Sequence, residues 1–229
     1  MAARPLSVTS WNGYAARWAV THGGFDPRLA APPVQGWLRM GYGLGRVLAR
    51  AGVAPGAVTA TGLLLALSVP ALAFMGGRAI LLAAAAVVLG SLADTLDGAV
   101  AVLSGRATRL GYVYDSVVDR LAEIAWFAAL WLVGAPAPLV IAAAALCWLH
   151  EYVRARATAA GMTELGVVTI AERPTRVAVS FVGLLMAGLG GMLVADMAAG
   201  AATLATAMMV LLGVLGLAQL LAAVHRILG

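Results

Sequence analysis

Four aspartates stand in two regularly spaced pairs within apolar sequence. Asp94 and Asp97 are three residues apart, and Asp115 and Asp119 are four apart, so each pair shares one face of a helix. Carboxylate oxygens are hard ligands that suit Mg²⁺ or Mn²⁺. Two ions bridged by shared carboxylates are an arrangement used for phosphoryl transfer. The spacing therefore predicts a site for two divalent ions formed by these four side chains.

A short loop near Gly105 separates the two pairs, so the helices that carry them should be antiparallel neighbours. At about 1.5 Å of rise per residue, Asp97 and Asp115 then differ in depth by about one helical turn. The alternative is that the aspartates form ion pairs with nearby arginines, which are Arg106, Arg109 and Arg120. That explanation would serve for one aspartate, but four at this spacing favour the metal site.

The surrounding composition is that of a membrane protein. Of the 229 residues, 62% are hydrophobic and 11% are charged, whereas soluble domains have about a quarter charged residues. A single Cys excludes an intrachain disulfide and a Cys-based zinc site. Several apolar runs exceed the roughly 18–20 residues that cross a bilayer. The sequence predicts an all-α integral membrane protein with six transmembrane helices, at about residues 55–75, 79–104, 110–133, 137–158, 174–194 and 200–226.

The N-terminal part differs from these spans. Residues 1–32 contain no long apolar run, so no cleavable signal peptide is expected and this part is predicted to be a cytoplasmic segment. Residues 33–51 alternate apolar side chains with arginine, which fits an amphipathic helix on the inner leaflet; a basic linker is the alternative. The membrane domain is accordingly placed at residues 33–229, with this juxtamembrane helix at its start.

The arginines orient the spans. All 15 basic residues are Arg, and with the N-terminus inside, the opposite face holds only Arg78. This asymmetry follows the positive-inside rule and, with six spans, puts both termini in the cytoplasm. The four aspartates then lie near the cytoplasmic face.

The aspartate segment resembles the signature of the CDP-alcohol phosphotransferases, D-x2-D-G-x2-A-R followed by G-x3-D-x3-D. Seven of its eight fixed positions match, namely Asp94, Asp97, Gly98, Ala101, Gly111, Asp115 and Asp119. The eighth, an Arg in the family, is Val102 here. The six-span plan also fits this family, which extends the resemblance over about residues 33–226.

The resemblance implies a chemistry. A CDP-linked lipid, usually CDP-diacylglycerol, binds with its diphosphate on two divalent metals, an acceptor alcohol attacks the β-phosphorus, and CMP leaves. Asp94, Asp97 and Asp115 match the main metal ligands. Asp119 matches the general base and is also assigned as a ligand of the second metal. The resemblance further implies a homodimer, and we expect it in a bacterial plasma membrane with its active site on the cytoplasmic side.

On the donor side, the glycines permit close approach of a ligand or of another helix. Gly98, Ala101 and Gly111 are assigned to the nucleotide by the motif, and Thr59 by a weaker match of residues 53–59 to a second family stretch. Because Val102 replaces the motif arginine, Arg106 and Arg109 are candidates to take its place.

On the acceptor side, Tyr-x-Arg-Ala-Arg at 152–156 and Glu-Arg-Pro-x-Arg at 172–176 resemble the bacterial phosphatidylinositol phosphate synthase branch, whose acceptor is inositol 1-phosphate. Arg154, Arg176 and Arg226 match its contacts to the acceptor phosphate, and Arg173 shares a helix face with Arg176. Ordinary membrane anchoring is the alternative for any one of these arginines. A glycerol 3-phosphate acceptor, as in phosphatidylglycerophosphate synthases, would use a similar basic pocket.

Two other hypotheses stay open at this stage. Intramembrane carboxylates also occur in divalent-cation and proton-coupled transporters, although a transporter site is expected near the midplane of two related halves. The loss of the motif arginine at Val102 could also mark a family member without catalytic activity. No nucleic-acid partner is expected.

Overall fold

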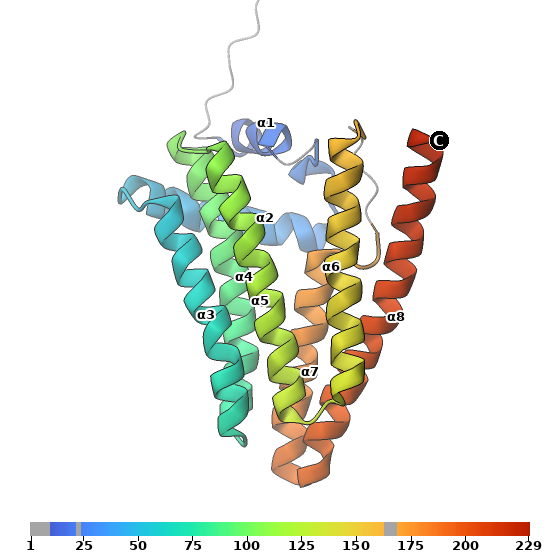
Figure 1. Ribbon diagram of the computed structural model, residues 1–229. Helices are drawn as coiled ribbons and strands as arrows, with labels where there is room; N and C mark the ends of the chain where they lie inside the picture. The colour runs from blue at the N-terminus through green and yellow to red at the C-terminus, as the bar shows by residue number, and fades with distance from the viewer. Residues whose placement is uncertain (1–9, 22–23, 163–168) are drawn as a thin grey trace, which may run out of the picture. The chain divides into compact units, whose positions relative to one another are not determined.

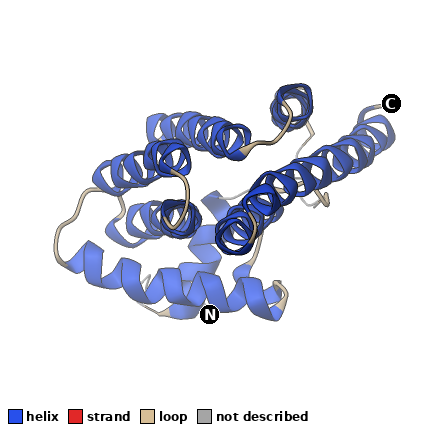
Figure 2. Cartoon of the chain, turned by 90° about the horizontal axis from the view of Figure 1, so that it is seen from below, coloured by secondary structure: helices blue, strands red, loops and turns tan. Residues whose placement is uncertain are grey.

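The computed structural model describes residues 10–21, 24–162 and 169–229. Within these residues all regular structure is helical, which confirms the all-α prediction (Figure 2). The elements are α1 (Trp11–Thr21), the short 3-10 helix η1 (Pro27–Leu29), α2 (Pro32–Arg50), α3 (Pro55–Met75), α4 (Ala79–Ser104), α5 (Arg109–Val133), α6 (Ala137–Ala159), α7 (Arg173–Leu193) and α8 (Ala195–Leu228) (Figure 1).

The helices α3 to α8 coincide with the six predicted spans, and the largest difference is that α8 begins five residues before the predicted start at 200. Four segments are long and apolar enough to cross a membrane, at Pro55–Met75, Ala79–Ser104, Arg173–Leu193 and Asp196–Leu228. In the part of the chain that the structure describes, α5 and α6 do not reach this standard. Charged side chains interrupt them, including Glu123 in α5 and Glu151 in α6. The membrane character is thus supported by four helices, and the count of six spans stays a prediction.

Contacts divide the chain into two compact units. Among the described residues, the first unit contains 10–21, 24–62 and 92–117, and the second contains 63–91, 118–162 and 169–229. The helices α3, α4 and α5 each contribute to both units. The first unit therefore holds Asp94, Asp97 and Asp115, and the second holds Asp119 and the predicted acceptor arginines.

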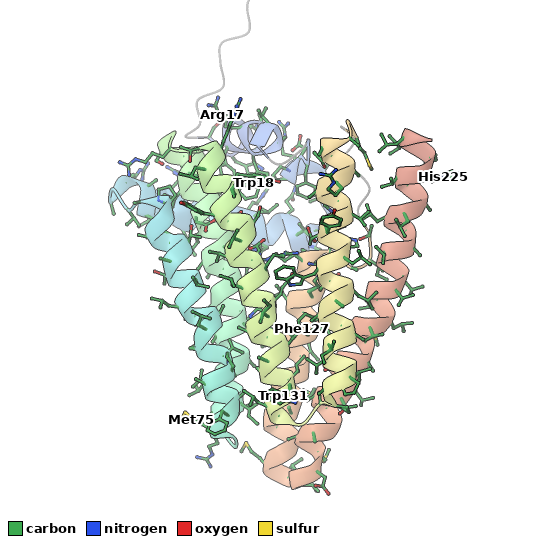
Figure 3. All side chains as sticks on the ribbon, viewed as in Figure 1. Arg17, Trp18, Met75, Phe127, Trp131 and His225 are labelled. Atoms are coloured by element: carbon green, nitrogen blue, oxygen red, sulfur yellow. The ribbon has the colours of Figure 1, made fainter. Side chains whose placement is uncertain are left out.

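The second unit has an apolar core in which α7 packs closely on α8 (Figure 1). Buried core side chains include Leu130 and Phe127 of α5 and Leu184 of α7, while Trp131 of α5 is half exposed (Figure 3). Small residues allow the helices to approach, because a Cβ at Gly183 of α7 would collide with the Cβ of Ala205 in α8.

This contact gives a first testable prediction. Gly183→Ala should lower the free energy of unfolding by about 1–3 kcal/mol, because the Ala205 methyl group is attached directly to backbone and cannot turn aside. Chemical unfolding in detergent micelles measures the change. The matched control is Gly200→Ala in α8, where a Cβ meets open space, and this variant should gain up to about 1 kcal/mol from helix propensity. Equal behaviour of the two variants would contradict the close packing.

The first unit contains a helix that the sequence did not predict. In α1, Tyr14 and Trp18 are buried with Leu38 of α2 and with Ala99 and Val102 of α4 (Figure 3, Trp18 labelled). We call these five residues the aromatic cluster. Partly buried Trp11, Tyr42 and Leu103 pack against it. Residues 1–9 and 22–23 of the predicted N-terminal segment lie outside the described residues.

The predicted juxtamembrane helix is present as α2, which begins and ends one residue earlier than predicted. It lies close to α4, since the indole Nε1 of Trp37 donates a hydrogen bond to Thr95 Oγ1 at 2.7 Å. Gly41 and Gly45 face Thr95 and Ala99 at distances that leave no room for a side chain. The position of α2 on a membrane surface stays a prediction.

Candidate functional site

The turn between α4 and α5 places the two aspartate pairs on facing helices. Gly105 has a φ of +68°, a conformation that L side chains rarely adopt, and it reverses the chain directly after Ser104. Thr108 then caps α5, because its Oγ1 accepts a hydrogen bond from the Gly111 backbone N–H at 3.0 Å. The antiparallel pair predicted from the short loop is thereby formed.

Carboxylates from these two helices come together in the first unit. One carboxylate oxygen of Asp94 and one of Asp115 lie within 4.8 Å of each other. Asp119 follows Asp115 by one turn of the same helix, and it offers an oxygen within the same distance of Asp115. Oxygen ligands of one Mg²⁺ or Mn²⁺ stand about 3–4 Å apart when each metal–oxygen distance is about 2.1 Å. The donor set is entirely carboxylate, so these residues fit a hard divalent cation.

Asp97 is not part of this group of carboxylates. Its side chain is buried, at 6% exposure, and it is hydrogen-bonded to Thr59 of α3. Asp94 precedes it by three residues of α4, on the same face of the helix. A buried carboxylate beside two others has a strong requirement for positive charge. The placement of Asp97 therefore agrees with a cation site on this side of α4, and Thr59 contacts a predicted ligand.

The remaining donor-side residues occupy the same unit. Gly98 and Ala101 follow Asp97 on α4, and Gly111 precedes Asp115 on α5. Arg106 and Arg109 are exposed at the turn between these helices. Val102, where the motif has arginine, is 5% exposed and belongs to the aromatic cluster.

Three of the four predicted acceptor arginines pair with carboxylates of the second unit. Arg173, at the start of α7, forms an ion pair with Asp119 and lies 5.9 Å from the centre of the Trp126 ring. Arg154 of α6 pairs with Glu172. Arg176 pairs with Glu123 at 2.7 Å and with Glu151 at 2.6 Å. The fourth, Arg226, is exposed near the end of α8.

Exposure separates these arginines into two kinds. The side chains of Arg154 and Arg173 keep 20% and 18% of their surface accessible, whereas Arg176 keeps 3%. A soluble phosphate can reach the first two without displacing a helix. Arg176 is instead enclosed by groups of the protein itself.

The sequence model of the CDP-alcohol phosphatidyltransferases matches residues 53–227. The chain belongs to this family. The matched region begins with the segment that carries Thr59 and includes both aspartate pairs and all four predicted acceptor arginines.

Relatives in the family include the phosphatidylinositol phosphate synthase of Corynebacterium glutamicum, which is 40% identical over 116 residues. Those residues are 46% of this chain and 52% of the relative, so the chain spans about half the length of that protein. Two solved structures of the Mycobacterium tuberculosis phosphatidylinositol phosphate synthase are also similar, each at 27% identity. The complex with manganese and citrate has a TM-score of 0.66 and covers 81% of this chain and 88% of that one. The form with CDP-DAG bound has a TM-score of 0.62, with 80% and 94% covered.

We did not predict from the sequence that three glutamates pair with the acceptor arginines. Glu123, Glu151 and Glu172 provide the carboxylates that pair with Arg176 and Arg154. A signal was present for Glu123, which follows Asp119 by four residues and so lies on the same face of α5. Glu151 and Glu172 stand beside the arginine motifs, but spacing alone does not identify which arginine each one meets.

The metal assignment gives a second prediction. Asp94→Asn and Asp115→Asn should each weaken Mn²⁺ binding by at least about 100-fold, since removal of an outer-shell partner alone costs 10–100-fold. Isothermal titration or Mn²⁺ electron paramagnetic resonance on the purified protein measures the affinity without turnover. Asp26→Asn is a matched control, because Asp26 pairs with Arg28 before η1, outside the aspartate motif. Unchanged affinity in both variants would remove the two residues as ligands.

Proposed function

We propose that this chain transfers the phosphatidyl group of CDP-diacylglycerol to a polar alcohol and releases CMP, with Mg²⁺ or Mn²⁺ as cofactor. The observation that carries the proposal is the approach of carboxylate oxygens of Asp94 and Asp115 within 4.8 Å, at two of the four positions where the family motif has aspartate. The relatives in bacteria support a lipid-synthesis role, since they carry the name phosphatidylinositol phosphate synthase.

The proposed reaction assigns a separate task to each group. Divalent ions held by Asp94, Asp97, Asp115 and Asp119 would neutralise the diphosphate of the donor. Asp119 accepts the proton of the attacking hydroxyl, whose oxygen forms a bond to the β-phosphorus while the bond from that phosphorus to the CMP oxygen breaks. The ion pair with Arg173 keeps the Asp119 carboxylate oriented at the start of α7.

The proposed nucleotide contacts are the motif residues of the first unit. Gly98, Ala101 and Gly111 have small side chains or none, so a ligand can approach their backbone, and Thr59 contacts Asp97. Arg106 and Arg109 are exposed at the adjoining turn and can approach a diphosphate from water. This placement supports them as replacements for the arginine that Val102 displaces.

Inositol 1-phosphate is the proposed acceptor, and glycerol 3-phosphate is the alternative. Both carry a phosphate, which the arginine fork recognises in two hydrogen bonds. Arg154, Arg173, Arg176 and Arg226 are proposed as its ligands. The side chains of Arg154, Arg173 and Arg226 retain access to solvent, and Arg176 follows Arg173 by one turn of α7. The matches to phosphatidylinositol phosphate synthases favour the inositol acceptor.

The protein is proposed to be a homodimer in a bacterial plasma membrane, with both termini and the active site on the cytoplasmic side. The concentration of arginine on one side of the predicted spans supports this orientation. Accessibility of single cysteines introduced at residues 77 and 107 to an impermeant thiol reagent tests it: residue 107 should react only from the cytoplasmic side and residue 77 only from the other.

A CMP-release screen tests the proposed reaction. Purified protein in lipid nanodiscs is supplied with CDP-diacylglycerol, Mn²⁺ and one of three acceptors: inositol 1-phosphate, glycerol 3-phosphate or free inositol. CMP should appear fastest with inositol 1-phosphate, and chelation of the metal should stop it. Absence of CMP with every acceptor, in protein that binds CDP-diacylglycerol, would favour a family member without activity. Mn²⁺ uptake into proteoliposomes without CMP release would favour the transporter alternative, which the family match makes less attractive.

A further inference from the structure

One carboxylate oxygen of α6 is surrounded by nitrogen atoms from three side chains. Glu151 Oε1 accepts a hydrogen bond from Arg176 Nη2 of α7 at 2.6 Å. The same oxygen lies 3.5 Å from Arg120 Nη1 of α5 and 3.6 Å from His150 Nδ1. All four residues belong to the second unit. Nitrogen donors that converge on one anionic oxygen are also the surroundings that bind a phosphate oxygen.

Arg120 and Arg176 share a second carboxylate, that of Glu123 in α5. Glu123 Oε1 is 3.2 Å from Arg120 Nη2 and 2.7 Å from Arg176 Nη1. Two arginines thus meet two glutamates, and we call these four side chains the charge group. Because the charge group has no net charge, it attracts an anion only weakly. An acceptor phosphate therefore requires one of the two glutamates to give way.

Exposure decides which glutamate can move. The side chain of Glu123 keeps 1% of its surface accessible, and its departure would leave positive charge uncompensated in the core. The side chain of Glu151 keeps 28%, so rotation to another rotamer can carry its carboxylate toward water. With Glu151 withdrawn, two arginines face one glutamate, and the excess positive charge favours an anion.

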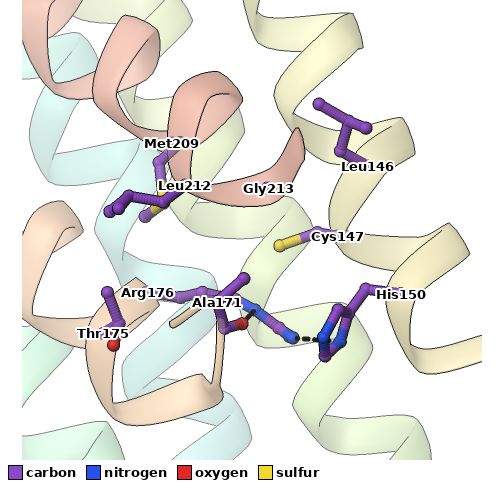
Figure 4. Close-up of a pocket in the computed structure, with 9 residues that line it drawn as sticks. All are labelled: Leu146, Cys147, His150, Ala171, Thr175, Arg176, Met209, Leu212 and Gly213. Carbon is purple, nitrogen blue, oxygen red and sulfur yellow. Dashed lines mark hydrogen bonds between the residues drawn. The ribbon is translucent and has the colours of Figure 1, made fainter. Parts of the chain in front are cut away.

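Arg176 keeps other contacts that hold it during such an exchange. Its Nε donates to the carbonyl oxygen of Ala171 at 2.7 Å, and its Nη2 lies 3.3 Å from the His150 ring (Figure 4). Contacts among the described residues use four of its five N–H donors, and departure of Glu151 releases one of these four. The cavity beside Arg176 has a volume of about 10 Å³, which is room for one water molecule. A phosphate must therefore take the place of Glu151 rather than fill existing space.

We propose that Glu151 Oε1 occupies, in the free protein, the place of one oxygen of the acceptor phosphate, and that Arg120 joins Arg176 as a ligand of this phosphate when Glu151 withdraws. The chemical class of the ligand is a phosphate monoester. Its role as acceptor rests on the proposed function. The exchange of a carboxylate for a phosphate on the two arginines is a binding event and requires no reaction.

Glu151→Gln tests the exchange through binding alone. Isothermal titration of inositol 1-phosphate into Mn²⁺-loaded protein in nanodiscs, without the lipid donor, measures the Kd. The variant should bind this ligand about tenfold more tightly, which is the gain expected when the blocked form is nine tenths of the free protein. Glycerol 3-phosphate should gain similarly, whereas free inositol, which has no phosphate, should not. Unchanged or weaker binding of both phosphate esters would overturn the proposal.

Glu151→Asp separates displacement from a general change in charge. This variant keeps the carboxylate but shortens the side chain by one methylene group, so it should hold Arg176 less well. It should bind inositol 1-phosphate more tightly than the wild type and less tightly than Glu151→Gln. It also covers the case in which Glu151→Gln does not fold. A gain in Glu151→Gln with none in Glu151→Asp would mean that net charge alone acts, and the place assigned to Oε1 would be wrong.

Arg120→Gln tests the second ligand. It should weaken the binding of inositol 1-phosphate by about tenfold or more, because a hydrogen bond between charged groups is lost. Arg120→Lys keeps the charge beside the buried Glu123 but loses the fork of donors, so it should lose part of the affinity and covers a folding failure of Arg120→Gln. The matched control is Arg156→Gln, at an exposed position of α6, which should change the Kd by less than about twofold. Wild-type affinity in both Arg120 variants would exclude this residue as a ligand.

This proposal and the proposed function fail in different ways. If the wild type releases no CMP but Glu151→Gln still tightens the binding of phosphate esters, phosphatidyl transfer is wrong and the exchange stands. If the wild type releases CMP but Glu151→Gln lowers neither the Kd nor the KM for inositol 1-phosphate, the exchange is wrong and the proposed function stands.

Discussion

Asp119→Asn should lower CMP release by about a thousandfold, within the 10²–10⁴-fold range of general-base catalysis. The asparagine amide has nearly the size of the carboxylate but cannot accept the proton of the attacking hydroxyl. The rate of CMP formation from CDP-diacylglycerol at saturating acceptor measures the loss. Hydrogen exchange and thermal unfolding of the variant should remain close to those of the wild type, since Asp119 is at the edge of the second unit with 18% of its side chain accessible.

Two comparisons separate the proton transfer from other effects. Asp119→Asn also removes the carboxylate that pairs with Arg173. Arg173→Gln, measured at saturating acceptor, sets an upper limit on the cost of losing that ion pair, because it also removes a proposed contact to the acceptor phosphate. Asp196→Asn makes the same chemical change at an exposed position in the first turn of α8 and should leave the rate unaltered. Activity of Asp119→Asn within about tenfold of the wild type would exclude this residue as the base.

Val102→Arg, which restores the residue of the family motif, should destabilise this protein by about 3 kcal/mol or more. Val102 is 5% exposed in the aromatic cluster, with Tyr14, Trp18 and Leu38 around it. An arginine there must either bury a charge among apolar rings or push α1 aside, and each costs several kcal/mol. Chemical unfolding in detergent measures the change. The fluorescence of Trp18, which is buried in the native protein, should shift toward the wavelength of a solvent-exposed tryptophan.

A matched substitution at an exposed position serves as the control for the destabilisation by Val102→Arg. Ala107→Arg adds the same side chain at an exposed position of the α4–α5 turn and should cost less than about 0.5 kcal/mol. Trp18→Ala opens space beside residue 102, so Val102→Arg should cost less in that background than in the wild type. A Val102→Arg variant as stable as the wild type would show that the aromatic cluster does not determine the residue at this position.

Features that depend on neighbouring residues in the chain were predicted well. The apolar runs located α3 to α8, and the short loop at Gly105 predicted that the helices carrying the two aspartate pairs are antiparallel neighbours. The carboxylates that approach across these helices are those of Asp94 and Asp115, whereas the depth argument had compared Asp97 with Asp115. Both inferences use local information, because helix length follows from the run and antiparallel pairing follows from a short connection.

Features that depend on distant residues were missed. Glu123 meets Arg176 across 53 positions of the chain, and only packing determines that pair. The short α1 has a sequence with no strong period, and a helix of 11 residues is marginal in water without tertiary contacts. Its contacts with Tyr42 and Leu38 supply what its own sequence does not.

The aromatic cluster joins residues outside the region that the family model matches to residues inside it. The match to the family model begins at residue 53, yet Tyr14 and Trp18 of α1 pack with Ala99 and Val102 inside the matched region. A chain shortened to the shared region would present an apolar surface on α4 to solvent or to other copies, a recognised cause of aggregation. The buried surface of the first unit therefore depends on residues of α1 and α2 that lie before the matched region, so a truncation at residue 53 would remove part of the folded core.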